Sequence, residues 1–94
     1  MDYLLIPKIL FRDEKLKKMK CKSKVLYAFL LTKFEKNKKV INLDKLQDEI
    51  NTNDMTDKVI LRCLDELKRF KIIDFSIVNN NLHIKSLILF DLED

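Results

Sequence analysis

Residues 42–90 read NLDKLQDEINTNDMTDKVILRCLDELKRFKIIDFSIVNNNLHIKSLILF, and this stretch decides the fold. Apolar residues recur at helical spacing over 43–50 and again over roughly 55–69, which predicts two amphipathic helices. The polar residues 51–53 between them favour a turn, because Asn and Thr side chains bond nearby backbone. The expected N-caps are Asn42 for the first helix and Asp54 or Thr52 for the second. Two helices joined in this way form a helix-turn-helix.

The next two segments, 71–78 and 82–90, are rich in β-branched and aromatic residues. They flank Asn79, Asn80 and Asn81, and asparagine accepts positive φ more readily than other residues with side chains. Apolar and polar residues alternate on both sides of this turn. We therefore expect a β-hairpin with one apolar and one polar face.

Two elements precede the helix-turn-helix. A helix is expected over 21–36, with Asn37 as its stop, because apolar side chains again follow a helical period. Val40 and Ile41 predict a short strand, which would support a hairpin that is only marginally stable by itself. The order of three helices, a short strand and a terminal hairpin predicts an α+β fold, a winged helix-turn-helix. At 94 residues, the chain is expected to form a single domain over 1–94.

The N-terminal residues 1–12 are expected to form an extended arm, since Pro7 disfavours a helix interior. The polar residues 12–20 are expected to hold a short helical turn around Leu16. The arm and the end of the last strand, 87–90, are more apolar than a monomer of this size needs. A homodimer through one or both is therefore expected, and it would suit repeated DNA half-sites.

Composition argues against several function classes. The chain has no glycine, and phosphate loops, dinucleotide-binding turns and nucleophile elbows all depend on glycine. Cys21 and Cys63 have no metal-ligand spacing, and His83 is the only histidine. We expect no enzymatic activity, cofactor, metal, small-molecule ligand or membrane partner. Free thiols and the lack of a visible signal peptide favour a cytoplasmic protein.

The charge is unevenly distributed along the chain, although the formal net charge is only +4. Residues 1–42 carry twelve basic and four acidic side chains, whereas residues 43–94 carry seven basic and eleven acidic ones. A basic region on a mixed domain is typical of a protein with a polyanionic partner. A lysine-rich composition with solvated faces is the alternative interpretation.

Two motifs resemble a known family. The segments IPKILF (6–11) and SKVLYAFLL (23–31) are similar to the N-terminal winged-helix domain of RepA_N-type plasmid replication initiators. Ser23 replaces the usual alanine, the insertion before the strand is shortened to residues 36–39, and no replication domain follows. Small winged-helix accessory proteins of conjugative plasmids have a similar size. The resemblance thus implies a protein that binds an origin of replication or of conjugative transfer.

A winged helix normally places its third helix in the major groove of DNA. Here Thr56, Lys58 and Arg62 are the candidates on that helix, while Asp54 and Asp57 are interpreted as helix-capping residues. The wing offers hydrogen-bonding groups for base readout, or its asparagines serve only the turn. The predicted wing contacts are Ser76, Asn79, Asn80, Asn81, His83 and Lys85. The predicted backbone contacts are Lys22, Lys24, Lys58, Arg62, Arg69 and Lys71.

Three functions remain open at this stage. The first is sequence-specific binding of double-stranded DNA at a plasmid or mobile-element origin. The second is a transcriptional regulator of the same fold. The third is a protein-interaction adaptor in a replication or relaxosome complex, which acidic residues on the third helix favour and the basic first half disfavours.

Overall fold

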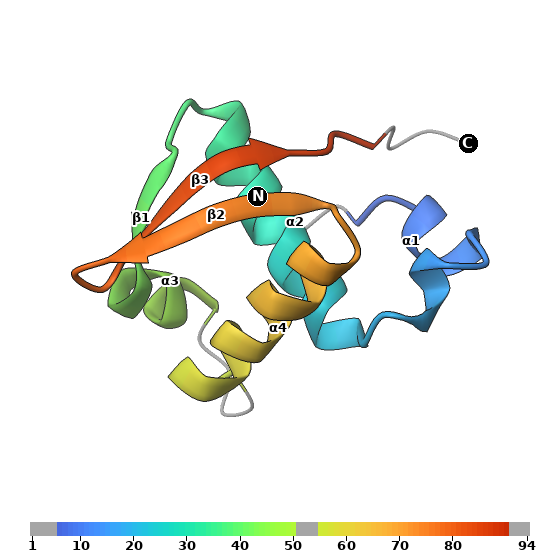
Figure 1. Ribbon diagram of the computed structural model, residues 1–94, viewed down its shortest axis with the longest axis horizontal. Coiled ribbons are helices and arrows are strands. Elements are labelled where there is room, and N and C mark those ends of the chain that lie inside the picture. The colour runs from blue at the N-terminus through green and yellow to red at the C-terminus, as the bar shows by residue number, and fades with distance from the viewer. Residues whose placement is uncertain (1–5, 51–54, 91–94) are drawn as a thin grey trace.

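The computed structural model describes residues 6–50 and 55–90, and within them the chain is an α+β domain (Figure 1). Four α-helices, one 3₁₀ turn and a three-stranded antiparallel sheet occur in these ranges. In chain order they are α1 (Ile9–Arg12), η1 (Leu16–Lys18), α2 (Cys21–Glu35), β1 (Val40–Asn42), α3 (Leu43–Ile50), α4 (Asp57–Arg69), β2 (Ile73–Val78) and β3 (Asn81–Leu87). The predicted order of helix, short strand, two helices and hairpin is confirmed, and it is compatible with a winged helix.

The sheet has the order β1-β3-β2, so the last strand in the sequence is the central one. β1 pairs with β3 from Val40 opposite His83 to Asn42 opposite Asn81. The hairpin turn consists of Asn79 and Asn80, whose φ angles of 51° and 62° are those of a type I′ turn. The predicted third strand and asparagine turn are therefore confirmed.

The two hairpin strands are shorter than the sequence predicted, whereas β1 extends one residue further, to Asn42. β2 begins at Ile73 because Lys71, with φ of 60°, ends α4 in a left-handed conformation. The Lys71 and Ile72 amides donate to the carbonyls of Lys68 and Leu67, which is the Schellman pattern. α2 ends in the same way at Asn37, with φ of 63°. Asparagine and lysine thus replace the glycine usual at these positions.

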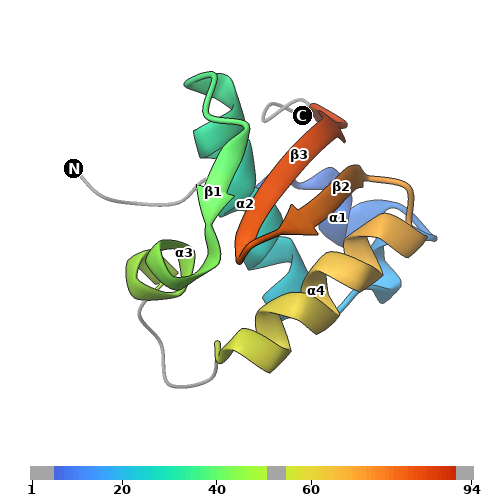
Figure 2. The same cartoon turned by 60° about the vertical axis from the view of Figure 1, so that its left-hand side comes forward.

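One face of the sheet is buried against the helices. Figure 1 shows α2 behind the sheet and α4 below it, and Figure 2 shows α3 beside β1. Apolar residues from these elements are fully or almost fully buried: Leu26, Leu30, Leu46, Leu64, Leu67 and Leu82. On the opposite face, Ser76, His83 and Lys85 stay half-buried or exposed. This alternation confirms the predicted apolar and polar faces of the hairpin, although Ile77 on the inner side is 40% exposed.

The predicted extended arm is wrong for its second half. Ile9–Arg12 form helix α1, which begins after Pro7, whose carbonyl accepts the Leu10 amide at 3.1 Å. Proline's fixed φ suits a helix start, and Leu10 is completely buried. Tertiary burial therefore stabilises a helix too short to form alone. Residues 1–5 lie outside the described part of the chain, and the predicted turn around Leu16 is confirmed as η1.

The start of α4 also differs from the prediction. The proposed caps Thr52 and Asp54, and the turn over 51–53, lie outside the described residues. The cap observed is Thr56, whose Oγ1 accepts the Val59 amide at 3.4 Å. The helix starts two residues later than expected because Met55 is buried and precedes the cap. The predicted cap of α3 is confirmed, since Asn42 Oδ1 accepts the Lys45 amide at 3.1 Å.

Candidate nucleic-acid interface

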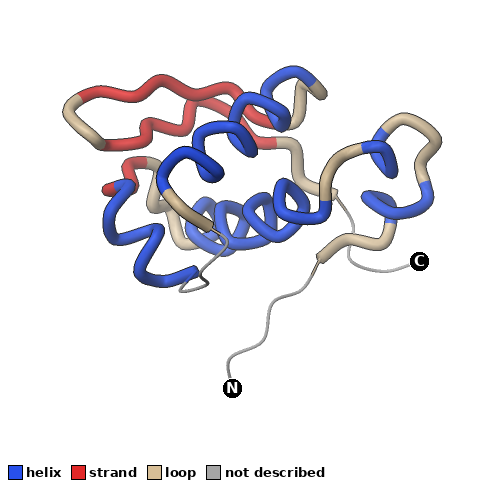
Figure 3. Tube along the Cα trace, turned by 90° about the horizontal axis from the view of Figure 1, so that it is seen from below, coloured by secondary structure: helices blue, strands red, loops and turns tan. Residues whose placement is uncertain are grey.

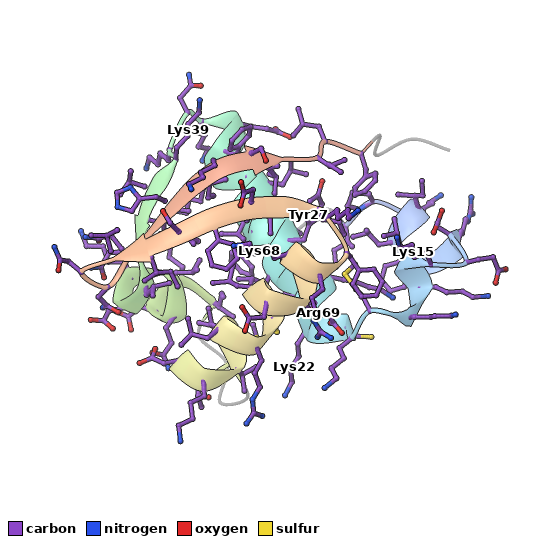
Figure 4. All side chains as sticks on the ribbon, viewed as in Figure 1. Lys15, Lys22, Tyr27, Lys39, Lys68 and Arg69 are labelled. Carbon is purple, nitrogen blue, oxygen red and sulfur yellow. The ribbon has the colours of Figure 1, made fainter. Side chains whose placement is uncertain are left out.

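An open groove of about 650 Å³ lies between the N-terminal end of α2 and the exposed side of α4. Figure 4 shows Lys22 and Arg69 at this junction, which brings together residues 47 positions apart in the sequence. The basic side chains that line the groove are Lys20, Lys22, Arg62, Lys68 and Arg69. The acidic ones are Asp65 and Glu66. The groove thus carries an excess of positive charge on a surface that faces solvent.

Three predicted contact residues share one side of α4. Lys58, Arg62 and Arg69 are exposed and are spaced four and seven residues apart, which aligns them along the helix. Asp65 lies in the same row, and Asp57 lies in the first turn. The exposed side of α4 therefore offers cations for a polyanion, with two carboxylates that reduce its net charge.

Glu66 is half-buried at the edge of the groove and ties α4 to the start of α2. Its Oε1 accepts the Lys20 amide at 3.0 Å and the Ser23 hydroxyl at 2.6 Å. Lys20 is the N-cap residue of α2, and its own side chain makes no capping bond. Glu66 thus satisfies donors at the positive end of α2 from a different helix. One negative charge of the groove is therefore committed to the fold.

Replacing Glu66 with glutamine is expected to change stability and DNA affinity in opposite directions. The neutral amide weakens two charge-assisted hydrogen bonds, so the free energy of unfolding is expected to fall by about 1 kcal/mol. Removing a carboxylate from the groove is expected to strengthen DNA binding several-fold. Urea unfolding and fluorescence anisotropy measure the two effects. Glu14→Gln, at an 89% exposed site, is the control, and weaker DNA binding by the Glu66 variant would contradict this role.

Cys63 lies beside this contact and also lines the groove. Only 5% of the residue is exposed, and burial raises the pKa of its thiol, although the Ser23 side chain opposes the shift. Cys63 is therefore a neutral part of the groove wall. Cys21 is exposed, and neither residue forms a disulfide.

The prediction that Lys24 contacts DNA is contradicted. Lys24 is only 3% exposed, and its ammonium donates to the Lys17 carbonyl at 3.3 Å. The same ammonium lies 4.4 Å from the centre of the Phe11 ring. The apolar stem fills space between α1 and α2, and these contacts compensate for the buried charge. Lys22, two residues earlier, is exposed and lines the groove, so its predicted DNA contact stays a prediction.

Lys68 is a cation of this region that sequence reasoning did not select. Its ammonium lies 4.9 Å from the centre of the Phe75 ring and 3.9 Å from the Asp74 carboxylate. It also donates to the Phe75 carbonyl at 3.5 Å. These contacts direct Lys68 to β2 and fix the side of α4 that faces the hairpin. Lys20 was likewise not selected, although it belongs to the basic run of the first half.

The hairpin tip is tied to α3. The backbone amide of Leu43 donates to the Asn80 carbonyl at 3.0 Å. The side-chain Nδ2 of Asn42, which precedes α3, donates to Asn81 Oδ1 at 3.4 Å. The side chains of Asn79 and Asn80 are exposed and make no hydrogen bond within the described residues. Their backbone therefore forms the turn while their amide groups stay accessible. Asn81 differs, because its side chain already serves the fold.

The other predicted wing residues occupy the open face of the sheet. Ser76 pairs with His83 across β2 and β3, and both are half-buried. Lys85 is exposed on the same strand as His83. Lys71 is exposed at the end of α4, and Thr56 at its start is also exposed while it serves as the cap.

The predicted contacts do not form one compact patch. The hairpin tip lies at the left end of the molecule in Figure 1, whereas Lys15 lies at the right end in Figure 4. The longest dimension of the domain is 37 Å, about one turn of B-DNA. The structure brings Lys22, Arg62 and Arg69 together in the groove, while the hairpin tip forms a separate region. Figure 3 shows that α1 and η1 form a further unit beyond α2.

The chain matches no protein-family model, no curated protein and no solved structure. The resemblance of 6–11 and 23–31 to replication initiators therefore stays a prediction. Within residues 6–50 and 55–90, no three His, Cys, Asp or Glu side chains gather in an arrangement that would hold a metal ion. Across the same ranges, every helix is too short or too polar to cross a bilayer.

Proposed function

We propose that this domain is a winged helix-turn-helix that binds double-stranded DNA without catalysing a reaction. The observation that carries the proposal is the groove between α2 and α4, where five basic side chains meet beside an exposed helix. Positive charge concentrated along a concave surface attracts the phosphates of DNA. The sheet order and the succession of α3, α4 and the hairpin in the chain support the winged-helix assignment.

In the proposed complex, α4 enters the major groove with its exposed side facing the bases. Lys58 lies on that side, and Lys22, Arg62 and Arg69 bind phosphates on the flank formed by the groove between α2 and α4. The turn at Asn79 and Asn80 reaches the adjacent groove, because both amide side chains are accessible there. A length of 37 Å suits contacts over about one helical turn.

The DNA target that we propose is an origin of replication or conjugative transfer on a plasmid or mobile element. This finer proposal rests on the resemblance of 6–11 and 23–31 to replication initiators. Binding to an operator as a transcriptional regulator is the alternative with the same fold. Relaxosome or replication proteins are the corresponding protein partners.

Fluorescence anisotropy of the full chain on fragments of its own replicon, against random duplex, tests the proposal. We expect one fragment to be preferred even at about 0.2 M salt, with a log–log salt slope that implies several phosphate contacts. The preferred fragment then distinguishes an origin from an operator. Weak binding that disappears equally for all sequences as salt rises would contradict the proposal.

A second candidate function, a protein-interaction adaptor, is favoured by an exposed apolar patch. The patch consists of four residues that are 41–61% exposed: Ile9, Phe11, Ile88 and Leu89. Phe11 lies against Lys24, and Phe90 lies 5.8 Å from Tyr27, measured between ring centres. Lys24 and Tyr27 are one turn apart on α2, so α1 and the segment after β3 approach the same part of that helix.

We propose that this patch holds two copies of the chain together. Leu89→Asp is expected to shift a dimer to monomer at micromolar concentration, because it places a charge in an apolar interface. Sedimentation velocity measures the change. Val40→Asp, at a 57% exposed site on the sheet, is the matched control and should leave the dimer intact. A monomeric parent chain would contradict the prediction, and a protein partner would then be sought for the patch.

A further inference from the structure

Leu61 is the exposed apolar residue of α4. It is 41% exposed, while its neighbours on the solvent side of the helix are charged. Its neighbours on the helix surface are Lys58, three residues before it, and Asp57 and Asp65, four residues before and after it, on the side of α4 that we propose faces DNA. Leu61 is not needed to complete the core, because that role belongs to Ile60 and Leu64, which are at most 1% exposed.

The contacts of Lys68 show which way Leu61 faces. Lys68 packs over Phe75 of β2, and Leu61 lies seven residues earlier, on the same side of α4. β2 continues to the left end in Figure 1, where it carries Ile77 and Val78, 40% and 52% exposed, whereas α4 ends below the sheet and nearer the middle. Exposed apolar groups thus occur on both elements that the proposed complex presents to DNA, with Leu61 on α4 and Ile77 and Val78 on opposite faces of β2.

We propose that Leu61 reads thymine through its C5-methyl group, which gives the domain a preference for A·T-rich sites. The inference rests on the proposed function. The methyl group of thymine is the apolar feature that a base pair shows in the major groove, and an exposed aliphatic side chain is complementary to it. Because α4 is the helix that we propose enters the major groove, a base pair is the surface that Leu61 meets there.

The accessible side-chain amides of Asn79 and Asn80 also favour A·T pairs. Asparagine forms paired hydrogen bonds with the N6 and N7 groups of adenine in the major groove. In the minor groove, asparagine also distinguishes A·T from G·C pairs. Leu61 on the helix would recognise thymine, and the asparagines on the wing would recognise A·T pairs in the adjacent groove. Both elements thus favour A·T pairs, by different chemistry and at different positions of the site.

The experiment compares duplexes of about 20 base pairs, roughly two helical turns, that differ only at the C5 position of pyrimidines. The first pair is alternating d(A-T) and alternating d(A-U), which lacks the methyl group. The second pair is alternating d(G-C) and its 5-methylcytosine form, which adds a methyl at the same place. We expect each covered methyl to strengthen binding by about fourfold, the effect of burying one methyl-sized group.

Leu61→Ala is expected to abolish the difference within both pairs. Val40→Ala, at a 57% exposed site on β1 that the proposed complex places against neither DNA nor a second copy, is the control and should retain it. Circular dichroism and thermal unfolding of both variants show that they fold. Equal binding of d(A-T) and d(A-U) by the parent chain would overturn the inference while leaving DNA binding intact. A preference for thymine that persists in Leu61→Ala would also overturn it, and failure to bind any duplex would contradict the proposed function itself.

Discussion

Replacing Arg62 and Arg69 together by glutamine is expected to weaken DNA binding by about 30-fold at about 0.15 M salt. Both guanidinium groups line the groove between α2 and α4, and each is assigned one phosphate. Each phosphate contact that is lost lowers the number of counterions released on binding by about 0.9. The log–log salt slope is therefore expected to become shallower by about 1.8 for the two contacts. Because the two groups are exposed, stability is expected to change by about 0.5 kcal/mol or less.

The control for this variant removes the same charge elsewhere. Lys36 and Lys38 are exposed in the connection from α2 to β1, which lies at the top of Figure 1, whereas α4 lies below the sheet. Lys36→Gln with Lys38→Gln is expected to leave the salt slope nearly unchanged. If both double variants lost affinity equally, net charge rather than the groove would bind DNA. Replacing both arginines with lysine retains the charge and should restore most of the slope.

The second large effect is expected at Tyr27. Its ring is completely buried, and its hydroxyl donates to the Ile88 carbonyl at 2.6 Å and accepts the Phe90 amide at 3.4 Å. Tyr27→Phe keeps the ring but leaves these two backbone groups without their partner. It is expected to lower the free energy of unfolding by about 1–3 kcal/mol. Tyr27→Ala also removes the ring and is expected to cost about 3–5 kcal/mol, a large share of the stability of a domain this size.

The two variants distinguish the hydroxyl from the ring by urea unfolding. Because the hydroxyl anchors the segment after β3, amide exchange at Phe90 is expected to speed up in Tyr27→Phe. Thr32→Val removes another hydroxyl from α2, one that donates only to a carbonyl of its own helix, and serves as the control. A phenylalanine variant as stable as the parent chain would show that the anchor is unnecessary.

Stability is also expected to depend on Tyr27 at alkaline pH. Burial raises the pKa of this hydroxyl above its ordinary value of 10.0, while its bond with Phe90 opposes the shift. The unfolded chain therefore loses this proton at lower pH than the folded chain does. The stabilising contribution is complete below about pH 10 and declines as pH rises from there through the folded pKa. The difference in stability between the parent chain and Tyr27→Phe is expected to shrink over that range.

Local signals in the sequence predicted the elements that depend on local chemistry. Asn42 caps α3 because its side chain reaches an amide three residues away, and Asn79 and Asn80 form the turn because asparagine tolerates positive φ. The amphipathic periods of α3 and α4 were sufficient because each helix covers the shared core with one face, whereas α2 is buried over more of its circumference and was predicted from its apolar residues at helical spacing. These features set the element order, and with it most of the fold.

Contacts between distant residues were not predictable in the same way. Glu66 bonds with Ser23, 43 residues away, and Tyr27 bonds with Ile88, 61 residues away. The exposed position of Lys22 and the buried position of Lys24 differ because α1 folds back over only one of them. Among the proposed DNA contacts, sequence reasoning therefore selected three of the five groove cations, included Lys24 and omitted Lys20 and Lys68.

The strand order of the sheet has a consequence for synthesis of the chain. β3 follows β1 and β2 in the chain and is the central strand, since β1 and β2 each pair with it and not with each other. Until Asn81–Leu87 leave the ribosome, no part of this sheet can form, and neither Ile41 nor Phe75 has its strand partner. Translation that stops before β3 thus yields two unpaired strands beside exposed helices, a species prone to aggregate.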